Sequence, residues 1–289
     1  MTDARLSRKC YSEREVKFMK SYFFLMTVDV DPPFSSKQNY VIEDGIHHLL
    51  DLFEKYSIKA TFFVPGVVAE KFPDIMEKIM KKNHEIACHG LKHTSIEATL
   101  NVHKQIQIIS IATRLIESIT GFRPVGFRAP LFEINKDCWI ALYKNGYLYD
   151  SSVVLSPLFR NFRNPFQSRP FFLMKPKVNH DFGLLEIPVS VNPFLPLPLG
   201  GGWLRTFGLK WAKTGIKINF TLRSPVVFYI HPKDLVNIYT PGLSWYMYKN
   251  TTVCLKMLVD IIKYVKRSGG RFIKALELAH FIFNMGDTM

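Results

Sequence analysis

Two aspartates follow a strongly apolar stretch near the start of the chain. The segment FFLMTVDVDPP, residues 23–33, places Asp29 and Asp31 two positions apart and ends at two prolines. Its apolar and β-favouring residues predict a buried strand, and residues two apart on a strand point to the same side. Two carboxylates so placed can divide the work of a hydrolytic site, one as a metal ligand and the other as a base.

Two histidines in the segment CHGLKHT have a spacing that suits a metal ion. His89 and His93 are four apart, and neutral imidazoles at this spacing can reach one ion from a helical turn or a compact loop. The chain has nine histidines, so one such pair is weak evidence by itself. The histidine pair becomes stronger evidence for a site because Arg128 and His231 also follow apolar, strand-like segments.

The elements that must position these residues alternate between strands and helices. Apolar or β-branched runs predict strands within 23–28, 59–66, 84–90, 124–130, 183–190 and 224–232. Helical spacing predicts helices at 41–56, 72–83, 99–120 and 135–146, one more before residue 224 and two after residue 232. Such alternation favours a parallel sheet covered by helices, either open or closed as a barrel.

The chemistry of such folds belongs at the carboxyl ends of the strands. Polar residues stand at those predicted ends: Asp29, Asp31, His89, Arg128, Asp150 and His231. A metal held by one carboxylate and two imidazoles keeps coordination positions open for water and substrate. A second carboxylate can then take a proton from the attacking water. The residues themselves leave open which aspartate takes which role.

Four of these segments together resemble a known family. TVDVD, HGLKH, RAPL and IHP, in this order and spacing, resemble the motifs of NodB-type polysaccharide deacetylases, carbohydrate esterase family four. ATFFVPGVVAEKFP, HEIACHG, GFRAPLF, GYLYDSS, GLLEIPVS, LGGGW and VVFYIHPKDL are similar to the subgroup associated with exopolysaccharide biosynthesis. The resemblance implies an α/β fold of the distorted (β/α) barrel type with seven strands. It also implies metal-dependent removal of N-acetyl groups from N-acetylhexosamine residues of a polysaccharide or a lipid-linked glycan precursor.

The resemblance also implies a metal site and a base. Asp31, His89 and His93 resemble the metal ligands, and Asp29 resembles the general base. Many relatives have adjacent aspartates, whereas here Val30 separates them, so an exchange of the two roles stays open. Zinc suits a His/His/Asp set best, and nickel, cobalt, manganese and iron fit the same ligand types.

The remaining roles follow in the same way. Arg128 resembles the arginine that pairs with the base, and His231 resembles the general acid that protonates the leaving amine. Asp150 is matched to the carboxylate that tunes this histidine. Leu131 stands where relatives often have a tyrosine whose backbone N–H helps bind the oxyanion, a donor that survives the change of side chain.

Two alternatives to the deacetylase remain. One is an allantoinase-like hydrolase of a small cyclic or linear amide on the same barrel. The other is a catalytically silent glycan-binding homologue. Glu186, in GLLEIPVS, fits a place in the substrate cleft and a structural role equally well.

Composition and charge limit the partners. A net charge of +14 and an isoelectric point near 9.6 favour anionic partners, but no nucleic-acid recognition motif is present, so we expect none of that class. The helix pattern WLRTFGLKWAKTGIK sets Trp203, Phe207 and Trp211 four apart among basic residues. This stripe fits either a contact with a membrane or a lipid-linked sugar, or an ordinary buried helix face. Nothing in the sequence indicates an oligomeric state.

The ends and the cysteines bear on domain limits and location. We expect residues 1–21 to be an N-terminal extension and residues 22–289 to form one deacetylase-like domain. Neither an apolar leader nor a run of membrane-spanning length is found, which predicts a cytoplasmic protein, free or at the inner face of the membrane. Four cysteines without a CxxC pair predict reduced, buried thiols.

Overall fold

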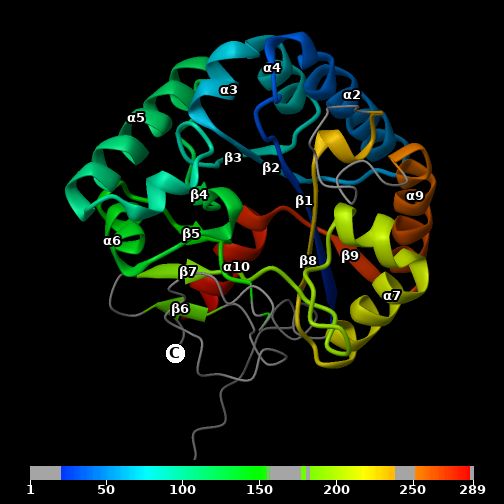
Figure 1. Cartoon of the computed structure of the whole chain (residues 1–289). Coiled ribbons are helices and arrows are strands. Elements are labelled where there is room, and N and C mark those ends of the chain that lie inside the picture. The colour runs from blue at the N-terminus through cyan, green and yellow to red at the C-terminus, as the bar shows by residue number, and fades with distance from the viewer. Residues whose placement is uncertain (1–20, 155, 157–176, 180–182, 238–250, 287–289) are drawn as a thin grey trace, which may run out of the picture.

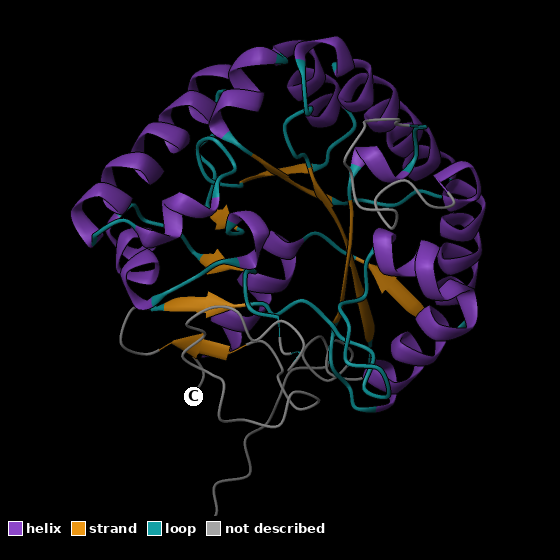
Figure 2. Ribbon diagram, in the orientation of Figure 1, coloured by secondary structure: helices purple, strands orange, loops and turns teal. Residues whose placement is uncertain are grey.

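The protein is a curved sheet surrounded by an arc of helices. The computed structural model describes residues 21–154, 156, 177–179, 183–237 and 251–286. Figure 1 shows the helices running around the outside of the sheet, and Figure 2 shows the strands gathered within that arc. The predicted extension at residues 1–21 lies, apart from Ser21, outside the described residues.

The sheet is almost entirely parallel. Its strands run in the order β6 (Lys177–Asn179), β7 (Leu184–Glu186), β5 (Tyr149–Asp150), β4 (Gly126–Phe127), β3 (Glu85–Cys88), β2 (Thr61–Val64), β1 (Tyr22–Asp29) and β8 (Val226–Ile230). The seven strands from β7 to β8 are parallel, and only β6 is antiparallel to its neighbour. A further strand, β9 (Gly270–Phe272), pairs in parallel with the first residues of β1. The predicted seven-stranded (β/α) barrel is confirmed.

The two edges of the parallel sheet approach each other through irregular chain. After β7, the backbone N–H of Ser190 donates to the carbonyl of Val227 at 3.2 Å. The N–H of Val227 donates in turn to Ser190 Oγ at 2.9 Å. Gly200 forms a parallel bridge with Tyr229. The barrel is therefore distorted, because a few irregular contacts replace a strand ladder at its seam.

Helices cover the outside of the sheet. They are α2 (Tyr40–Lys55), α3 (Gly66–Lys71), α4 (Pro73–Lys81), α5 (Val102–Thr120), α6 (Lys136–Lys144), α7 (Gly201–Thr221) and α9 (Thr251–Arg267). The last helix, α10 (Ala275–Gly286), packs instead against the inner face of the sheet. Two of the helices have a clear cap. Asn135 Oδ1 accepts the N–H of Cys138 at 2.8 Å to begin α6, and Gly121 ends α5 with a φ of 74°. No helix in the described residues is both long and apolar enough to span a membrane.

The alternation of side chains along β1 divides the core into two parts. Phe24, Met26 and Val28 pack into the cluster that includes the helix residues Ile46 and Leu49, outside the sheet. Phe23 and Leu25 join the other cluster, which includes Leu278 and Ala279 of α10. Because both faces of β1 are buried, Thr27 is the one polar residue among its buried positions before Asp29.

Some local features differ from the sequence prediction. The short elements α3, β6 and β9 were not predicted, because three to six residues carry too little periodicity. Helix α7 changes direction at Gly208, whose φ of 79° interrupts the helical backbone. Cys88, Cys138 and Cys254 are buried free thiols as expected, and Cys10 lies outside the described residues.

Candidate active site

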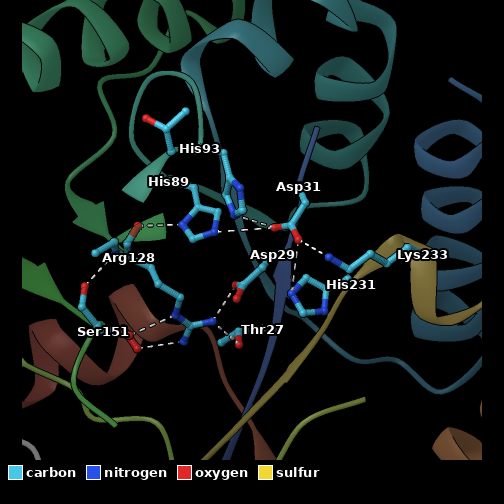
Figure 3. Close-up of polar contacts among 12 residues, drawn as sticks. Thr27, Asp29, Asp31, His89, His93, Arg128, Ser151, His231 and Lys233 are labelled. Atoms are coloured by element: carbon cyan, nitrogen blue, oxygen red, sulfur yellow. Dashed lines mark hydrogen bonds and ion pairs between the residues drawn. The ribbon is translucent and has the colours of Figure 1, made fainter. Parts of the chain in front are cut away.

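A pocket of about 450 Å³ opens at the carboxyl ends of the parallel strands. Five of the predicted site residues line it: Asp29, Asp31, His89, His93 and His231. They come from the ends of β1, β3 and β8 and from the loops that follow, so the barrel brings together residues some 200 positions apart in the sequence. Arg128 lies fully buried next to this pocket, and Figure 3 shows how its side chain approaches Asp29.

Asp31, His89 and His93 form a cluster that can hold a metal ion. One ligand atom from each lies within 4.8 Å of the others. Asp31 Oδ1 is 3.0 Å from His93 Nε2 and 3.8 Å from His89 Nε2. In Figure 3 the two imidazoles face the same oxygen of the carboxylate.

The tautomer of His89 is set by its surroundings. The Nδ1–H donates to the backbone carbonyl of Arg128 at 2.7 Å, which leaves the lone pair of Nε2 toward Asp31. Burial also lowers the pKa of His89 to about 4, so that the ring is neutral near pH 7. A neutral imidazole with a fixed orientation is the form that a metal requires.

His93 occupies a compact loop held by Glu97. The Glu97 carboxylate accepts the backbone N–H groups of Leu91 at 2.9 Å and Lys92 at 2.8 Å. His93 itself has a φ of 60°, which is costly for a residue with a side chain. The loop thus supports a strained conformation that directs the ring to Asp31. Sequence reasoning did not single out Glu97, although its position three residues after Thr94 matches a capping box, which the structure contains.

The donor set fits a metal ion by two independent observations. Asp31 Oδ1 is buried, and apart from the ion-pair contact of 3.0 Å with His93 Nε2 it has no hydrogen-bond partner among the described residues. A buried carboxylate oxygen without a partner is unfavourable unless a cation satisfies it. One carboxylate and two imidazoles are also a common zinc ligand set.

Asp29 is held by a buried ion pair. Arg128 Nη1 donates to Asp29 Oδ1 at 2.7 Å and to Thr27 Oγ1 at 2.8 Å. The rest of the guanidinium donates to the carbonyl and hydroxyl of Ser151 at 3.0 and 2.8 Å. These four bonds, all made inside the protein, fix the arginine and through it the carboxylate.

His231 is paired with Asp234, and this corrects the prediction for Asp150. The ring Nδ1 of His231 lies 3.3 Å from Asp234 Oδ2, which also accepts the His231 backbone N–H at 2.9 Å. Arg205 in turn donates to the other oxygen of Asp234. Burial raises the pKa of Asp234, but His231 and Arg205 together hold that pKa well below its usual value. The carboxylate is therefore ionised beside the ring.

Asp150 has different neighbours. Trp139 Nε1 donates to its Oδ2 at 3.1 Å, and the Ser152 hydroxyl donates to its Oδ1. Burial raises the pKa of Asp150 and, together with the charge of Asp150, raises that of Glu186 far above the usual value. Glu186 accepts the backbone N–H of Val153 at 3.1 Å and does not line the pocket. The structure does not pair Asp150 with His231, because Asp234, in the turn that follows β8, contacts the ring instead.

Lys233 is another site residue that the sequence prediction missed. Its ammonium group donates to Asp31 Oδ2, and His231 Nε2 lies 3.6 Å from the same oxygen. Burial raises the pKa of Asp31, but Lys233, His231 and His93 hold that pKa well below its usual value. The sequence signal that could have identified Lys233 was its position two residues after His231, just beyond a strand end.

Comparisons with known proteins agree with this arrangement. Residues 21–149 match the family model for polysaccharide deacetylase. This segment belongs to the polysaccharide deacetylase family. A second model, a domain of unknown function (DUF3473), matches residues 160–266. The polysaccharide deacetylase segment supplies β1 to β5, and the second segment supplies β7 and β8 to the same sheet.

The curated relatives of the polysaccharide deacetylase segment are matched over part of their length. The peptidoglycan deacetylase-like protein FGM2 of Gibberella zeae is 40% identical over 111 residues, which are 38% of this chain and 32% of that protein. The peptidoglycan deacetylase of Helicobacter pylori is 35% identical over 112 residues, 39% of this chain and 38% of that protein. The chain thus spans about a third of the length of these relatives.

Solved structures confirm the fold. A Mycobacterium smegmatis protein described as a polysaccharide deacetylase superposes with a TM-score of 0.67 at 19% identity, covering 92% of this chain and 91% of that one. The Bacillus anthracis protein BA3943, a CE4 family pseudoenzyme, superposes with a TM-score of 0.54 at 14% identity over 90% of this chain and 66% of that one. Since the fold is shared with a pseudoenzyme, any case for activity must rest on the site.

Proposed function

We propose that the chain is a metal-dependent hydrolase that removes N-acetyl groups from N-acetylhexosamine residues of a polysaccharide or a lipid-linked glycan precursor. The observation that carries the proposal is the placement of three units in one pocket. These are the Asp31–His89–His93 cluster, the Asp29–Arg128 pair and the His231–Asp234 pair. A ligand set, a base and an acid are what hydrolysis of an amide needs.

Asp29 is the proposed base. It takes a proton from water while the oxygen of that water attacks the acetyl carbon. Arg128 holds the carboxylate at 2.7 Å, and the protein satisfies the rest of the guanidinium, so the base keeps its orientation through the reaction. The reverse assignment, with Asp31 as base, is disfavoured because Asp31 and not Asp29 approaches both histidines.

His231 is the proposed acid. It gives a proton to the amide nitrogen as the carbon–nitrogen bond breaks, which releases acetate and a free amino sugar. Asp234 fixes the orientation of the ring from the Nδ1 side, so that Nε2 is the atom that faces the pocket. The same division of contacts, a carboxylate on Nδ1 and the reaction on Nε2, orients histidines in other hydrolases.

Stabilisation of the carbonyl oxygen has two proposed sources. A divalent ion bound by Asp31, His89 and His93, most simply zinc, would supply Lewis-acid polarisation of the acetyl group. The backbone N–H of Leu131 is the proposed oxyanion donor, since Leu131 lines the pocket with a φ of 56° in a tight turn after β4.

Acetate release from N-acetylglucosamine oligomers tests this function. The purified chain is assayed as isolated, after treatment with a chelator, and after zinc is added back. We expect release that the chelator abolishes and zinc restores. The same protein is offered small ureides, so that turnover of a ureide without acetate release would favour the allantoinase-like alternative. A chain that holds one metal ion and turns over neither substrate would match the silent glycan-binding alternative.

A contact with a membrane or a lipid-linked sugar stays part of the proposal. The rings of Trp203 and Phe207 stack at 6.0 Å, and those of Phe207 and Trp211 lie 5.6 Å apart. Phe207 is 42% exposed, whereas the buried residues of α7 lie on its other face. Flotation with anionic vesicles at low salt tests the contact, and Phe207→Ser is expected to reduce it. A chain that stays at the bottom of the gradient would contradict it.

A further inference from the structure

Lys233 keeps donor capacity that the described residues do not use. An ammonium group has three N–H donors, and Asp31 Oδ2 accepts one of them. The Lys233 ammonium nitrogen also lies 5.9 Å from the centroid of the Phe34 ring. Lys233 lines the pocket, so the remaining donors are available to a molecule bound there. In Figure 3 its side chain reaches Asp31 from the side away from His89 and His93.

Ion pairs balance the negative charges of the carboxylates that line the pocket. Three carboxylates line it, and in the described structure each is paired with its own basic residue. The pairs are Asp29–Arg128, Asp31–Lys233 and Asp234–Arg205. A neutral set of this kind becomes positive when a divalent cation joins it.

The rest of the pocket wall suits a sugar ring. Leu131, Phe132, Trp203 and Tyr229 line it with aliphatic and aromatic side chains, and the rings of Phe132 and Tyr229 meet edge-on at 5.2 Å. Such walls with a few polar groups are typical of small-molecule sites. The position of a charged group on the ligand is therefore set by Lys233 rather than by the wall.

Lys233 also lies close to the proposed site of bond cleavage. His231 and Lys233 both approach Asp31 Oδ2. Since His231 is the proposed donor to the amide nitrogen, a group on Lys233 belongs near the sugar carbon that carries this nitrogen.

We propose that the acetylated sugar bears a carboxylate next to its N-acetyl group and that Lys233 binds this carboxylate. The inference rests on the proposed deacetylase function and narrows its substrate class to acidic N-acetylated amino sugars. N-acetylmuramic acid has this chemistry, because its carboxylate belongs to the substituent on the ring carbon adjacent to the one that bears the amide. N-acetylglucosamine is its neutral counterpart.

Equilibrium binding tests the inference apart from turnover. The probes are the disaccharide of N-acetylglucosamine and N-acetylmuramic acid, its methyl ester, and neutral diacetylchitobiose. They are titrated calorimetrically into the full chain carrying Asp29→Asn, with zinc and again after chelation. We expect the acidic disaccharide to bind about tenfold or more tightly than the other two, because a hydrogen bond between charged groups is worth that much.

Variants assign the preference to Lys233. In the same background, Lys233→Met should remove the preference, Lys233→Arg should keep it, and Lys37→Met, at an exposed lysine of the 3₁₀ turn before α2, should leave it unchanged. Metal content is measured for each variant. Loss of the preference in Lys233→Met, with and without zinc, would support the inference.

Different results would overturn the role of Lys233 and the proposed deacetylase function. Equal binding of the three probes, or a preference that survives Lys233→Met and disappears with the metal, would overturn the role of Lys233. Acetate release by the unaltered chain from both disaccharides at equal kcat/KM would keep the deacetylase and overturn the acidic substrate class. A binding preference with no acetate release from either sugar would overturn the deacetylase and leave an anion site at Lys233.

Discussion

The proposed base and the proposed acid are each held by a buried charged residue. Asp29 has Arg128, and His231 has Asp234, which is itself held by Arg205. Removing one partner of such a pair leaves the other charged and unpaired in the interior, which is costly. The orientation of the acid and of the base therefore depends on the buried residues Arg128, Asp234 and Arg205.

Asp234→Asn tests the support of His231. The amide keeps an oxygen that can accept the His231 backbone N–H, but it removes the negative charge beside the ring and leaves Arg205 without its ion pair. We expect kcat to fall by about tenfold to a hundredfold, with a smaller change in KM. Steady-state kinetics and bound metal are measured together. An unchanged kcat would mean that Asp234 does not position the proposed acid.

His93→Ala tests the metal cluster. Without this imidazole, Asp31 and His89 offer two ligands in place of three, so we expect bound zinc to fall from one ion per chain to background after dialysis. The matched control is His48→Ala, at an exposed histidine of α2. Metal is counted by plasma mass spectrometry. Retention of a full equivalent in His93→Ala would show that the ion is held elsewhere.

The sequence motifs were enough to predict several of the individual site residues. Asp29, Asp31, His89, His93 and His231 were named in advance, and they meet in one pocket. Asp234 and Lys233 were missed, although they follow His231 directly, because their roles depend on how the turn after β8 folds back. In that turn Asp234 accepts the backbone N–H of His231, which brings its carboxylate under the ring. The family resemblance matched Asp150 to this role, but in the structure Asp150 accepts hydrogen bonds from Trp139 and Ser152.

Individual turns and helices hold the loops of the site in place. The 3₁₀ turn η2 (Ser95–Thr99) supplies Glu97, which holds the loop before it and so His93. The helix patterns were strong enough to predict α2, α4, α5, α6 and α7, because each has an apolar face of several turns. The bend of α7 at Gly208 was not predictable, since glycine is compatible with both a straight and an interrupted helix.

His84, at the junction of α4 and β3, makes the stability of this part of the fold depend on pH. Its Nδ1 accepts the backbone N–H of Ala60 at 3.1 Å, and its ring packs against the rings of Phe53 and Phe62. Burial, and then the charges of Lys59, Lys82 and Lys274, lower its pKa from 6.5 to about 4. The unfolded chain therefore binds this proton first as the pH falls. Stability from neutral His84 is complete above pH 6.5 and is lost progressively toward pH 4.

We expect His84→Asn to flatten this dependence. The Asn oxygen can replace Nδ1 as the acceptor for Ala60 but does not titrate. Between neutral pH and about pH 4 the unaltered chain should lose up to about 3 kcal/mol that the variant does not lose. Urea unfolding across this pH range measures the difference, and His48→Asn is the exposed control. Parallel curves for His84→Asn and the unaltered chain would contradict the assignment.

The whole molecule brings the site together by closing one sheet. The segment that matches the deacetylase model contributes Asp29, Asp31, His89, His93 and Arg128, but His231 and its partners come from the segment that matches the second model. The βαβα order in the sequence was enough to predict a parallel sheet with its chemistry at one end. The irregular seam around Ser190 was not predictable, because its contacts depend on the barrel having already curved.

Metal binding should stabilise the entire fold, since its ligands come from separate strand ends. A ligand at a thousandfold excess over its dissociation constant adds about 4 kcal/mol to the free energy of unfolding. For a chain of this size that corresponds to a rise of roughly 10 °C in Tm. Thermal unfolding with zinc and with chelator measures the rise, and His93→Ala should show none. An equal rise in that variant would place the ion outside the cluster.

The most direct test of the account compares the unaltered chain with Asp29→Asn in the same preparation, measuring bound metal and acetate released from N-acetylated chito-oligosaccharides. We expect one metal ion per chain in both proteins. We also expect acetate release by the unaltered chain and a rate lower by about a hundredfold or more in the variant. Loss of the metal in Asp29→Asn would contradict the division of Asp29 as base and Asp31 as ligand. Full turnover by the metal-loaded variant would contradict the role of Asp29 altogether.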